Sequence, residues 1–414
     1  MRPSLHFTPA SGWMNDPHGI TVRNGAYDVF FQHVPDRTSW APHCHWGHAT
    51  GRDLLSLREG PIAIAPGGGD DGIWTGCIVE DGSTGHAFYT AVSTPDFGIG
   101  RIRIARSEDD SWSSWSKGDV VVEAPRDLDL VAFRDPFIRR DGELWRMFVG
   151  TSDREGTAMA LTYTSTDLAS WSYDGVALAR NTSEREPVWM GALWECPQIF
   201  DMDGCAVMLS SIWDADVLHY AAYAIGSFAD GRFSADQWGR LTWGSSYYAP
   251  SLFTDAEGRT SVVFWLRGIE GEDDGDGQGW AGALSVPYLL SVADGRLVAR
   301  PHPDVAAHRT RVYPDGVLPG LTADIEWTAR SGDLSVTSGE AAVVSASRQG
   351  DEIVVTTPSS SDTFPASEQV RIVIDGPVLE VSSDAALFAT AIHPEGADIH
   401  VSATDGELSV AGLA

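Results

Sequence analysis

The sequence is almost free of lysine and poor in positive charge. Lys117 is its single lysine, and 28 basic residues stand against 58 acidic ones, which gives a formal net charge of −30. A field of this sign repels nucleic acids and anionic membranes, so we expect neither as a partner. A neutral ligand such as a small carbohydrate is compatible with it. The same composition can also reflect a salty habitat or a GC-rich genome.

Cysteine is scarce as well. The four cysteines, Cys44, Cys77, Cys196 and Cys205, form no C-x-x-C pair in a chain of 414 residues. Disulfide scaffolds and zinc sites need more cysteines at closer spacing, so we predict reduced residues that pack in the core. We predict no cofactor.

Long apolar runs and long helical periods are both missing. No run approaches the roughly 20 residues that cross a bilayer. No signal-peptide pattern fits between Met1 and the motif that begins at Trp13. If Met1 is the native start, we expect a cytoplasmic protein; a chain trimmed of a signal peptide would be secreted.

What the sequence does contain is typical of an all-β protein. Aromatic residues make up 10% of it, with 16 tryptophans, and 43 glycines supply turns. Short apolar runs alternate with loops rich in Gly, Asp, Ser and Asn, which is the pattern of β-meanders. We predict strands at residues 27–32, 73–80, 87–92, 101–106, 133–139, 144–149, 158–164, 198–200, 206–212, 218–225, 251–254, 261–266 and 282–286.

A longer repeat lies above the strands. Five similar junctions, N-D-P, W-T-G, R-D-P, E-C-P and Y-A-P, begin roughly 50 to 60 residues apart, at Asn15, Trp74, Arg134, Glu195 and Tyr248. Each precedes or opens an apolar strand. Five four-stranded units of this size predict a five-bladed β-propeller over residues 1–305, whose innermost strands line a central funnel. The junctions would meet at one end of the funnel.

The composition and the strand pattern of the sequence change after about residue 300. Four prolines, Pro301, Pro303, Pro314 and Pro319, interrupt a linker-like stretch. Alternating runs then predict a small C-terminal β-sandwich over residues 320–414. It carries no clustered chemistry, so we expect it to buttress the propeller. The runs lie at residues 343–346, 353–356, 370–374, 378–381 and 399–401.

The stretch W-M-N-D-P-H-G at residues 13–19 places Asp16 before a proline. Proline disfavours the helical region for the residue before it, so we predict an extended Asp16, aimed by the backbone, and a turn at Gly19. Considered alone, such a stretch is typical of an ordinary surface turn. Two further carboxylates in proline junctions, Asp135 directly before Pro136 and Glu195 two residues before Pro197, favour a site instead.

If the propeller forms, Asp16, Asp135 and Glu195 converge at the funnel floor. Repulsion and partial burial would drive their pKa values apart. Glycoside hydrolysis uses such a pair, with one carboxyl ionised and the other protonated. Asn15 can donate a hydrogen bond to an ionised Asp16. Trp194, next to Glu195, favours a proton on that carboxyl.

Three motifs, W-M-N-D-P-H-G, F-R-D-P-F and W-E-C-P-Q, resemble in order and spacing the signatures of glycoside hydrolase family 32, which contains invertases, inulinases and levanases. The resemblance covers residues 6–302 and, more weakly, the chain after Val370. Further matching segments are F-F-Q ending at Gln32, H-W-G-H-A at 45–49, P-I-A-I-A-P at 61–66 and G-W-A-G-A-L-S-V-P at 279–287.

Members of this family have a five-bladed propeller and a β-sandwich, and they cleave β-fructosides with retention of configuration. The resemblance implies that Asp16 is the nucleophile, Glu195 the acid and base, and Asp135 the transition-state stabiliser. Arg134 would hold the carboxylates in register, or it forms a structural ion pair. Retention places nucleophile and acid about 5–5.5 Å apart.

The resemblance also implies a pocket for the terminal fructose. Asn15, Gln32, Trp40 and Trp74 match family positions that line it, and Thr75 follows Trp74. An amide suits vicinal hydroxyls, and an indole offers an apolar wall to the C–H face of a sugar. Structural roles stay open, because the amides can end strands and the tryptophans can belong to the core.

The sequence departs from the family at three places. His18 stands where asparagine is usual, W-T-G-C at Trp74 replaces F-S-G-S, and Gln198 replaces an acidic residue. A histidine near the nucleophile can titrate between pH 5 and 8, so we expect His18 to alter the acidic limb of activity. These changes affect substrate preference more than catalysis.

Two other groups of residues have the composition of metal sites. His33, His43, His45 and His48 gather in one segment, but we predict hydrogen-bonded residues on the funnel rim. The acidic run at residues 270–276 lacks the last glutamate of an EF-hand loop, so we predict a solvated flexible loop. We expect no metal.

The sequence therefore predicts an invertase-like β-fructofuranosidase that releases terminal fructose from sucrose or short fructo-oligosaccharides. A fructosyltransferase would use the same covalent intermediate. A catalytically silent sugar-binding propeller has no need of all three carboxylates. An inverting propeller enzyme that cleaves arabinan or xylan would place its acid and base further apart, and that activity does not explain the W-M-N-D-P motif. Homo-oligomerisation is left open by the sequence.

Overall fold

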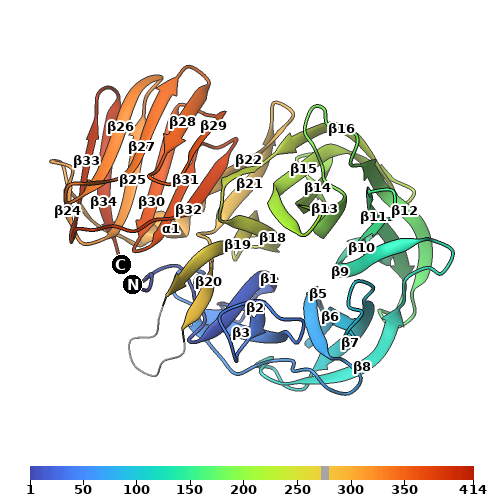
Figure 1. Cartoon of the computed structure of the whole chain (residues 1–414). Helices are drawn as coiled ribbons and strands as arrows, with labels where there is room; N and C mark the ends of the chain where they lie inside the picture. The colour runs from blue at the N-terminus through green and yellow to red at the C-terminus, as the bar shows by residue number, and fades with distance from the viewer. Residues whose placement is uncertain (272–278) are drawn as a thin grey trace.

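The computed structural model describes residues 1–271 and 279–414. In that part of the chain nearly all regular structure is β-strand, and the one helix, α1 (Pro303–Ala307), lies between a ring of blades and a two-sheet domain (Figure 1). None of the described helical structure is long and apolar enough to cross a membrane. The prediction of an all-β chain with a propeller and a sandwich is confirmed.

The blades surround a central opening (Figure 1), and the first four each contain four strands joined by hairpins. Every strand predicted in the first 286 residues overlaps an observed one. From the centre outwards, blade 1 has β1 (Gly12–Arg23), β2 (Ala26–Val34), β3 (His45–Gly51) and β4 (Arg58–Glu59); blade 2 has β5 (Gly72–Asp81), β6 (Thr84–Val92), β7 (Arg101–Ser107) and β8 (Trp115–Val122); blade 3 has β9 (Leu130–Asp141), β10 (Leu144–Asp153), β11 (Thr157–Ser165) and β12 (Ser172–Asn181); and blade 4 has β13 (Leu193–Met202), β14 (Cys205–Asp214), β15 (Val217–Ala229) and β16 (Arg232–Arg240).

The fifth blade closes the ring. Its strands are β18 (Tyr247–Thr254), β19 (Thr260–Gly271), β21 (Tyr288–Ala293) and β22 (Arg296–Pro301). A further strand, β20 (Trp280–Leu284), pairs with β19 on one side and runs parallel to β1 on the other, with Gly12 opposite Trp280. The last blade therefore shares one sheet with the first, and the ring has no open seam.

The five junctions are β-bulges on the innermost strands. The pairing register shifts at each of them, and the residue before each proline has a left-handed backbone: Asp16 (φ 40°), Asp135 (φ 61°), Cys196 (φ 51°) and Ala249 (φ 45°). A bulge bends the strand and re-aims its side chains. The predicted extended Asp16 is therefore wrong, because the pairing of the whole strand overrides the local preference before proline.

Gly19 does not turn the chain either. Strand β1 continues to Arg23 through a second register shift, between His18 and Thr21, and Gly19 has a φ of 59°. The predicted turn is a further bulge. As a result the whole segment from Trp13 to Arg23 remains one strand paired with β2, and a bulge lies on either side of Pro17 and His18.

The C-terminal domain is a sandwich of two sheets. It begins earlier than the predicted residue 320, because β23 and β24 already pair within it. The sheet next to the propeller also takes β17 (Thr242–Gly244) from the connection between blades 4 and 5. The other strands of that sheet are β23 (Arg309–Val312), β25 (Thr322–Thr328), β30 (Gln369–Asp375), β31 (Val378–Ser382), β32 (Leu387–Ala391) and β34 (Glu407–Leu413). The second sheet has β24 (Val317–Pro319), β26 (Ser331–Ser338), β27 (Ala341–Gln349), β28 (Glu352–Thr356), β29 (Ser361–Pro365) and β33 (Asp398–Ala403).

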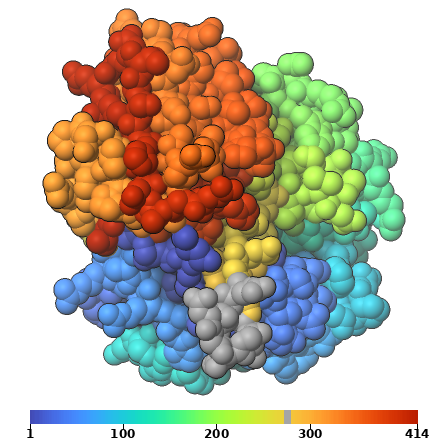
Figure 2. Space-filling view, turned by 60° about the vertical axis from the view of Figure 1, so that its left-hand side comes forward, coloured from blue at the N-terminus to red at the C-terminus, as the bar shows by residue number. Residues whose placement is uncertain are grey.

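A buried polar cluster joins the N-terminus to the sandwich. His6 is 3% exposed, with Nδ1 2.9 Å from Asp375 and Nε2 2.6 Å from Glu380. Glu380 also accepts hydrogen bonds from the hydroxyls of Tyr247 and Tyr288, both on blade 5. Figure 2 shows the first residues of the chain directly against the C-terminal strands. The cluster therefore ties both ends of the chain and the last blade together.

This cluster predicts a pH dependence of stability. Burial alone lowers the pKa of His6, but hydrogen bonds and negative charge from Asp375 and Glu380 outweigh it and raise the pKa from 6.5 to about 9. A raised pKa stabilises the fold below pH 6.5, and that contribution is lost as the pH rises to about 9. It is on the order of 3 kcal/mol.

We therefore expect the thermal midpoint of the wild-type protein to fall between pH 6.5 and 9 by more than that of His6→Gln. Scanning calorimetry across this range measures the difference, and titrations shared by both proteins cancel. His43→Gln, at an exposed histidine bound to Asp36, is the matched control. Parallel midpoint curves for wild type and His6→Gln would contradict the prediction.

Candidate active site

The repeat of five junctions becomes two rings of side chains in the funnel. The first residue of every junction lines one pocket of about 530 Å³ at the mouth: Asn15, Trp74, Arg134, Glu195 and Tyr248. The second residues form the ring below it: Asp16, Thr75, Asp135, Cys196 and Ala249. Of these, Asp16 and Asp135 also reach the pocket. All the predicted site residues except Thr75 line this pocket, and Thr75 lies in the lower ring.

Asp16 is held on one oxygen. Gln32 Nε2 donates to Oδ2 at 2.8 Å and Thr75 Oγ1 donates to the same atom at 2.7 Å. Among the described residues none donates a hydrogen bond to Oδ1. Burial and the negative charge of Glu195 raise the pKa of Asp16 to about 6, against hydrogen bonds, the strongest from Thr75, that lower it. The carboxylate is therefore oriented and ionised above about pH 6.

The pKa of Asp135 is raised further than that of Asp16. Its Oδ2 accepts the backbone N–H of Cys196 at 2.9 Å. Burial raises its pKa to about 7; Arg134 lowers the pKa, and Glu195 and Asp16 add to the rise. Burial and repulsion therefore raise the pKa of both Asp16 and Asp135, and the expected separation between the carboxyls is not seen for this pair.

Glu195 lies between two donors. Arg134 Nη2 donates to Oε1 at 2.8 Å, and the Tyr248 hydroxyl donates to Oε2 at 2.5 Å. The predicted apolar flank of Trp194 is not there, because neighbouring residues of a strand point to opposite faces. The Trp194 indole lies in the core between blades 3 and 4.

Tyr248 is a site residue that sequence reasoning missed. It is 2% exposed and stands in the fifth junction, at the position that Glu195 occupies in the fourth. The Y-A-P junction was itself recognised, but it carries no carboxylate. Aligning the junctions residue by residue is the signal that finds it.

Two buried amides line the pocket beside Asp16. Asn15 accepts the indole N–H of Trp13 at 2.9 Å. The amide nitrogen of Gln32 donates to Asp16 and Thr75, whereas its buried Oε1 has no hydrogen-bond partner among the described residues. A buried acceptor without a partner is costly unless a ligand supplies a donor, so Gln32 Oε1 suits a sugar hydroxyl.

Aromatic side chains form the rest of the wall. Trp40 is 42% exposed and packs edge-on against Trp74 and Phe97, with ring centroids 5.6 and 5.8 Å apart. Trp40 is therefore a rim residue and not core. Trp74 is 6% exposed and its indole N–H binds the carbonyl of Pro42, so it serves both core and pocket. The residues that the sequence analysis left out are Trp13, Phe97, Trp213, Asp216, Leu218, Trp265 and Arg267.

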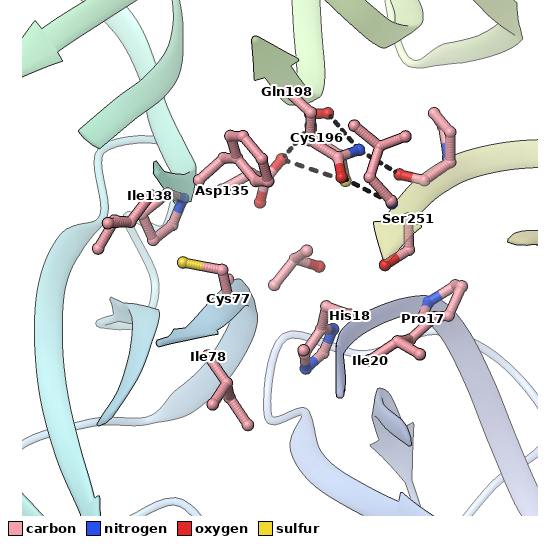
Figure 3. Close-up of a pocket in the computed structure, with 17 residues that line it drawn as sticks. Pro17, His18, Ile20, Cys77, Ile78, Asp135, Ile138, Cys196, Gln198 and Ser251 are labelled. Atoms are coloured by element: carbon pink, nitrogen blue, oxygen red, sulfur yellow. Dashed lines mark hydrogen bonds between the residues drawn. The ribbon is translucent and has the colours of Figure 1, made fainter. Parts of the chain in front are cut away.

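His18 does not titrate in the predicted range. Its Nδ1 lies 2.7 Å from the carbonyl of Asp16, and its ring packs on Trp46 at 4.2 Å between centroids. Burial lowers its pKa to about 3, so it is neutral wherever the enzyme would work. Figure 3 shows His18 on a second cavity, of about 80 Å³, which lies below the lower ring and also touches Cys77, Asp135 and Gln198. His18 supports the Asp16 backbone from below.

Three of the four histidines in residues 33–48 bind separate partners, whereas the buried Nδ1 of His45 has no hydrogen-bond partner among the described residues, against the prediction. His33 lies against the carbonyl of Trp13, His43 against Asp36 and His48 against Asp28. Within the described ranges, the one close group of metal-ligand types is Asp255, Glu257 and His302. Arg259 binds both carboxylates of that group, at 2.6 and 2.9 Å, which makes it an ion-pair network. The predicted acidic loop falls mostly on residues 272–278, outside the described residues.

All four cysteines are free thiols, as predicted. Cys44 and Cys77 are buried packing residues. Cys196 has a further role, because its Sγ lies 3.8 Å from Asp135 and 4.0 Å from Asp16, in addition to the backbone bond to Asp135. It separates the two carboxylates.

Comparisons with known proteins identify the family of the chain. Residues 6–301 match the family model of the glycosyl hydrolases family 32 N-terminal domain. Sucrose-6-phosphate hydrolase of Escherichia coli is 30% identical over 316 residues, which cover 72% of this chain and 64% of that protein. Raffinose invertase of Escherichia coli is 28% identical over 331 residues, which cover 75% and 67%. The chain thus spans a little under two thirds of the first relative.

Solved structures show the same fold over the whole chain. A family 32 β-fructofuranosidase of Bombyx mori, solved with sucrose, has a TM-score of 0.84 and 23% identity, and the match covers 100% of this chain and 93% of that one. Fructan 1-exohydrolase IIa of Cichorium intybus has a TM-score of 0.81 and 18% identity, with 100% and 97% covered. Because the family model matches well over half of its residues, the chain belongs to glycoside hydrolase family 32.

Proposed function

We propose that the protein is a retaining β-fructofuranosidase that releases terminal fructose from sucrose or short fructo-oligosaccharides. The observation that carries this proposal is the meeting of Asp16, Asp135 and Glu195, from three different blades, on one pocket of about 530 Å³. A retaining glycosidase needs a nucleophile and an acid about 5–5.5 Å apart on either side of the scissile bond. The family's sucrose and fructan hydrolases supply the substrate class.

In the first step, the free oxygen of Asp16 attacks the anomeric carbon of fructose. Glu195 gives its proton to the glycosidic oxygen, so the C–O bond breaks and the leaving sugar departs as an alcohol. A fructosyl ester on Asp16 remains. In the second step, Glu195 takes a proton from water, and the water oxygen displaces Asp16 with net retention.

The remaining residues bind the fructosyl group. Asp135 and Gln32 Oε1 accept hydrogen bonds from the sugar hydroxyls, and Asn15 lies beside them. Arg134 steadies Glu195 and lends positive charge to a site with three carboxylates. Trp74 and Trp40 exclude water from the apolar face of the sugar.

The test is to resolve the products from sucrose, inulin fragments and levan fragments. We expect equal amounts of glucose and fructose from sucrose, and nuclear magnetic resonance in the first minutes should show β-fructofuranose before mutarotation. Glucose in excess over fructose, with new trisaccharides, would instead identify a fructosyltransferase. No release from any of the three would refute the proposed activity. Asp16→Asn, purified in parallel, excludes a contaminating hydrolase.

A further inference from the structure

The hairpin between β14 and β15 borders the side of the pocket where the leaving group departs. It follows the strand that pairs with β13, and Trp213 lies opposite Leu193, two residues above Glu195 on the way to the mouth. Ala215 and Asp216 have left-handed backbones (φ 49° and 62°), as a tight two-residue turn requires. The acid must touch the glycosidic oxygen, so this hairpin faces the leaving sugar.

The positively charged side chains on this side of the pocket already bind protein groups. Arg134 and Arg267 are the cations among the described residues that line the pocket. Arg134 binds Glu195. Arg267 donates to the backbone carbonyls of Leu218 and His219 at 2.7 and 3.1 Å, and its Nε is closed off from solvent. Arg267 therefore fixes the hairpin and does not present a free guanidinium to a ligand.

A negatively charged side chain on this side, by contrast, has no ion-pair partner among the described residues. Asp216 lines the pocket from the hairpin tip, is exposed, and forms no ion pair with any described residue. With Asp16, Asp135 and Glu195 it makes four carboxyl groups against two arginines. The rest of the wall is aromatic or aliphatic and includes Trp213 and Leu218. A neutral sugar fits this lining, whereas a phosphate monoester brings about −1.5 to −2 charges near pH 7.

We propose that the leaving-group side of the pocket accepts neutral sugars and excludes phosphorylated ones, with Asp216 as the residue that discriminates. The inference rests on the proposed fructosidase activity and narrows its substrate class. It sets this chain apart from the relatives that are named for sucrose 6-phosphate.

The test compares kcat/KM for sucrose and for sucrose 6-phosphate. We expect sucrose to be favoured about tenfold or more at about 0.01 M salt. The ratio should shrink at about 1 M salt, because screening weakens repulsion between charges. Equal or higher kcat/KM on the phosphorylated sugar would overturn the inference and leave the proposed function intact. Failure to cleave either sugar would overturn the proposed function instead.

A pair of variants assigns the effect to Asp216. Asp216→Asn keeps the shape and the left-handed backbone, so the ratio of the two kcat/KM values should narrow severalfold. Asp214→Asn removes the same charge from the same hairpin but outside the pocket lining, and it should change the ratio much less. Asp216→Glu should restore the discrimination. Equal ratios for both Asn variants would overturn the role of Asp216.

Discussion

Asp16→Asn should lose fructose release from sucrose by on the order of 10⁴-fold or more, while the fold stays intact. An amide oxygen does not form the ester that the proposed first step requires. Asparagine keeps the volume of the side chain and can still accept hydrogen bonds from Gln32 and Thr75. It also tolerates the left-handed backbone at this position, where φ is 40° and alanine would add strain. The expected loss of activity therefore comes from the missing nucleophile and not from a change in the fold.

The measurement is initial fructose release, paired with the thermal midpoint. Asp294→Asn is the matched control, because Asp294 is exposed, has a φ of 50° in the hairpin between β21 and β22, and lies away from the pocket. It should retain wild-type activity. If Asp16→Asn keeps activity within tenfold of the wild type, Asp16 is not the nucleophile.

Glu195→Gln should show a loss that depends on the leaving group. On sucrose, whose leaving alcohol needs a proton, we expect a loss of about 10²–10⁴-fold in kcat/KM. On 4-nitrophenyl β-fructofuranoside, whose leaving group departs as an anion, the loss should be small. Glutamine can still accept from Arg134 through its carbonyl and bind the Tyr248 hydroxyl, so the site keeps its shape.

The same variant also lacks the base for the second step. Azide needs no base, so it should restore turnover of the aryl substrate in Glu195→Gln and yield a β-fructosyl azide. Glu80→Gln, at the exposed end of β5, is the control. Equal losses on both substrates, or no response to azide, would remove Glu195 as the acid and base.

The fold could be predicted because its signals repeat along the chain. Alternation of apolar residues located the strands, and five junctions at regular spacing located the inner strand of each blade. The carboxylates followed from the same junctions. The start of the sandwich was placed too late, because β23 and β24 are short edge strands with little apolar pattern, and β17 joins that domain from the propeller.

The site was harder to predict where burial or strand pairing decides the outcome. The rule for residues before proline gave the wrong backbone for Asp16, since the bulge is set by its partner strand. His18 was expected to titrate, but burial of its ring, which packs on Trp46, lowers its pKa and keeps it neutral. The hairpin residues Trp213 and Asp216 belong to no motif in the sequence, so their place in the pocket lining emerges only from the structure.

The parallel pairing of β1 with β20 also sets the order in which this protein is finished. The strand that carries Asp16 pairs with β2 as a local hairpin, but it gains its second neighbour, β20, only after Trp280 has been made. His6 can form its hydrogen bonds only after Asp375 and Glu380 have also been made. Domains usually fold as units while the chain is synthesised from its N-terminus. Here the strand of the proposed nucleophile is made before the strand that completes its sheet, so a chain that ends before Trp280 lacks the closed ring around the site.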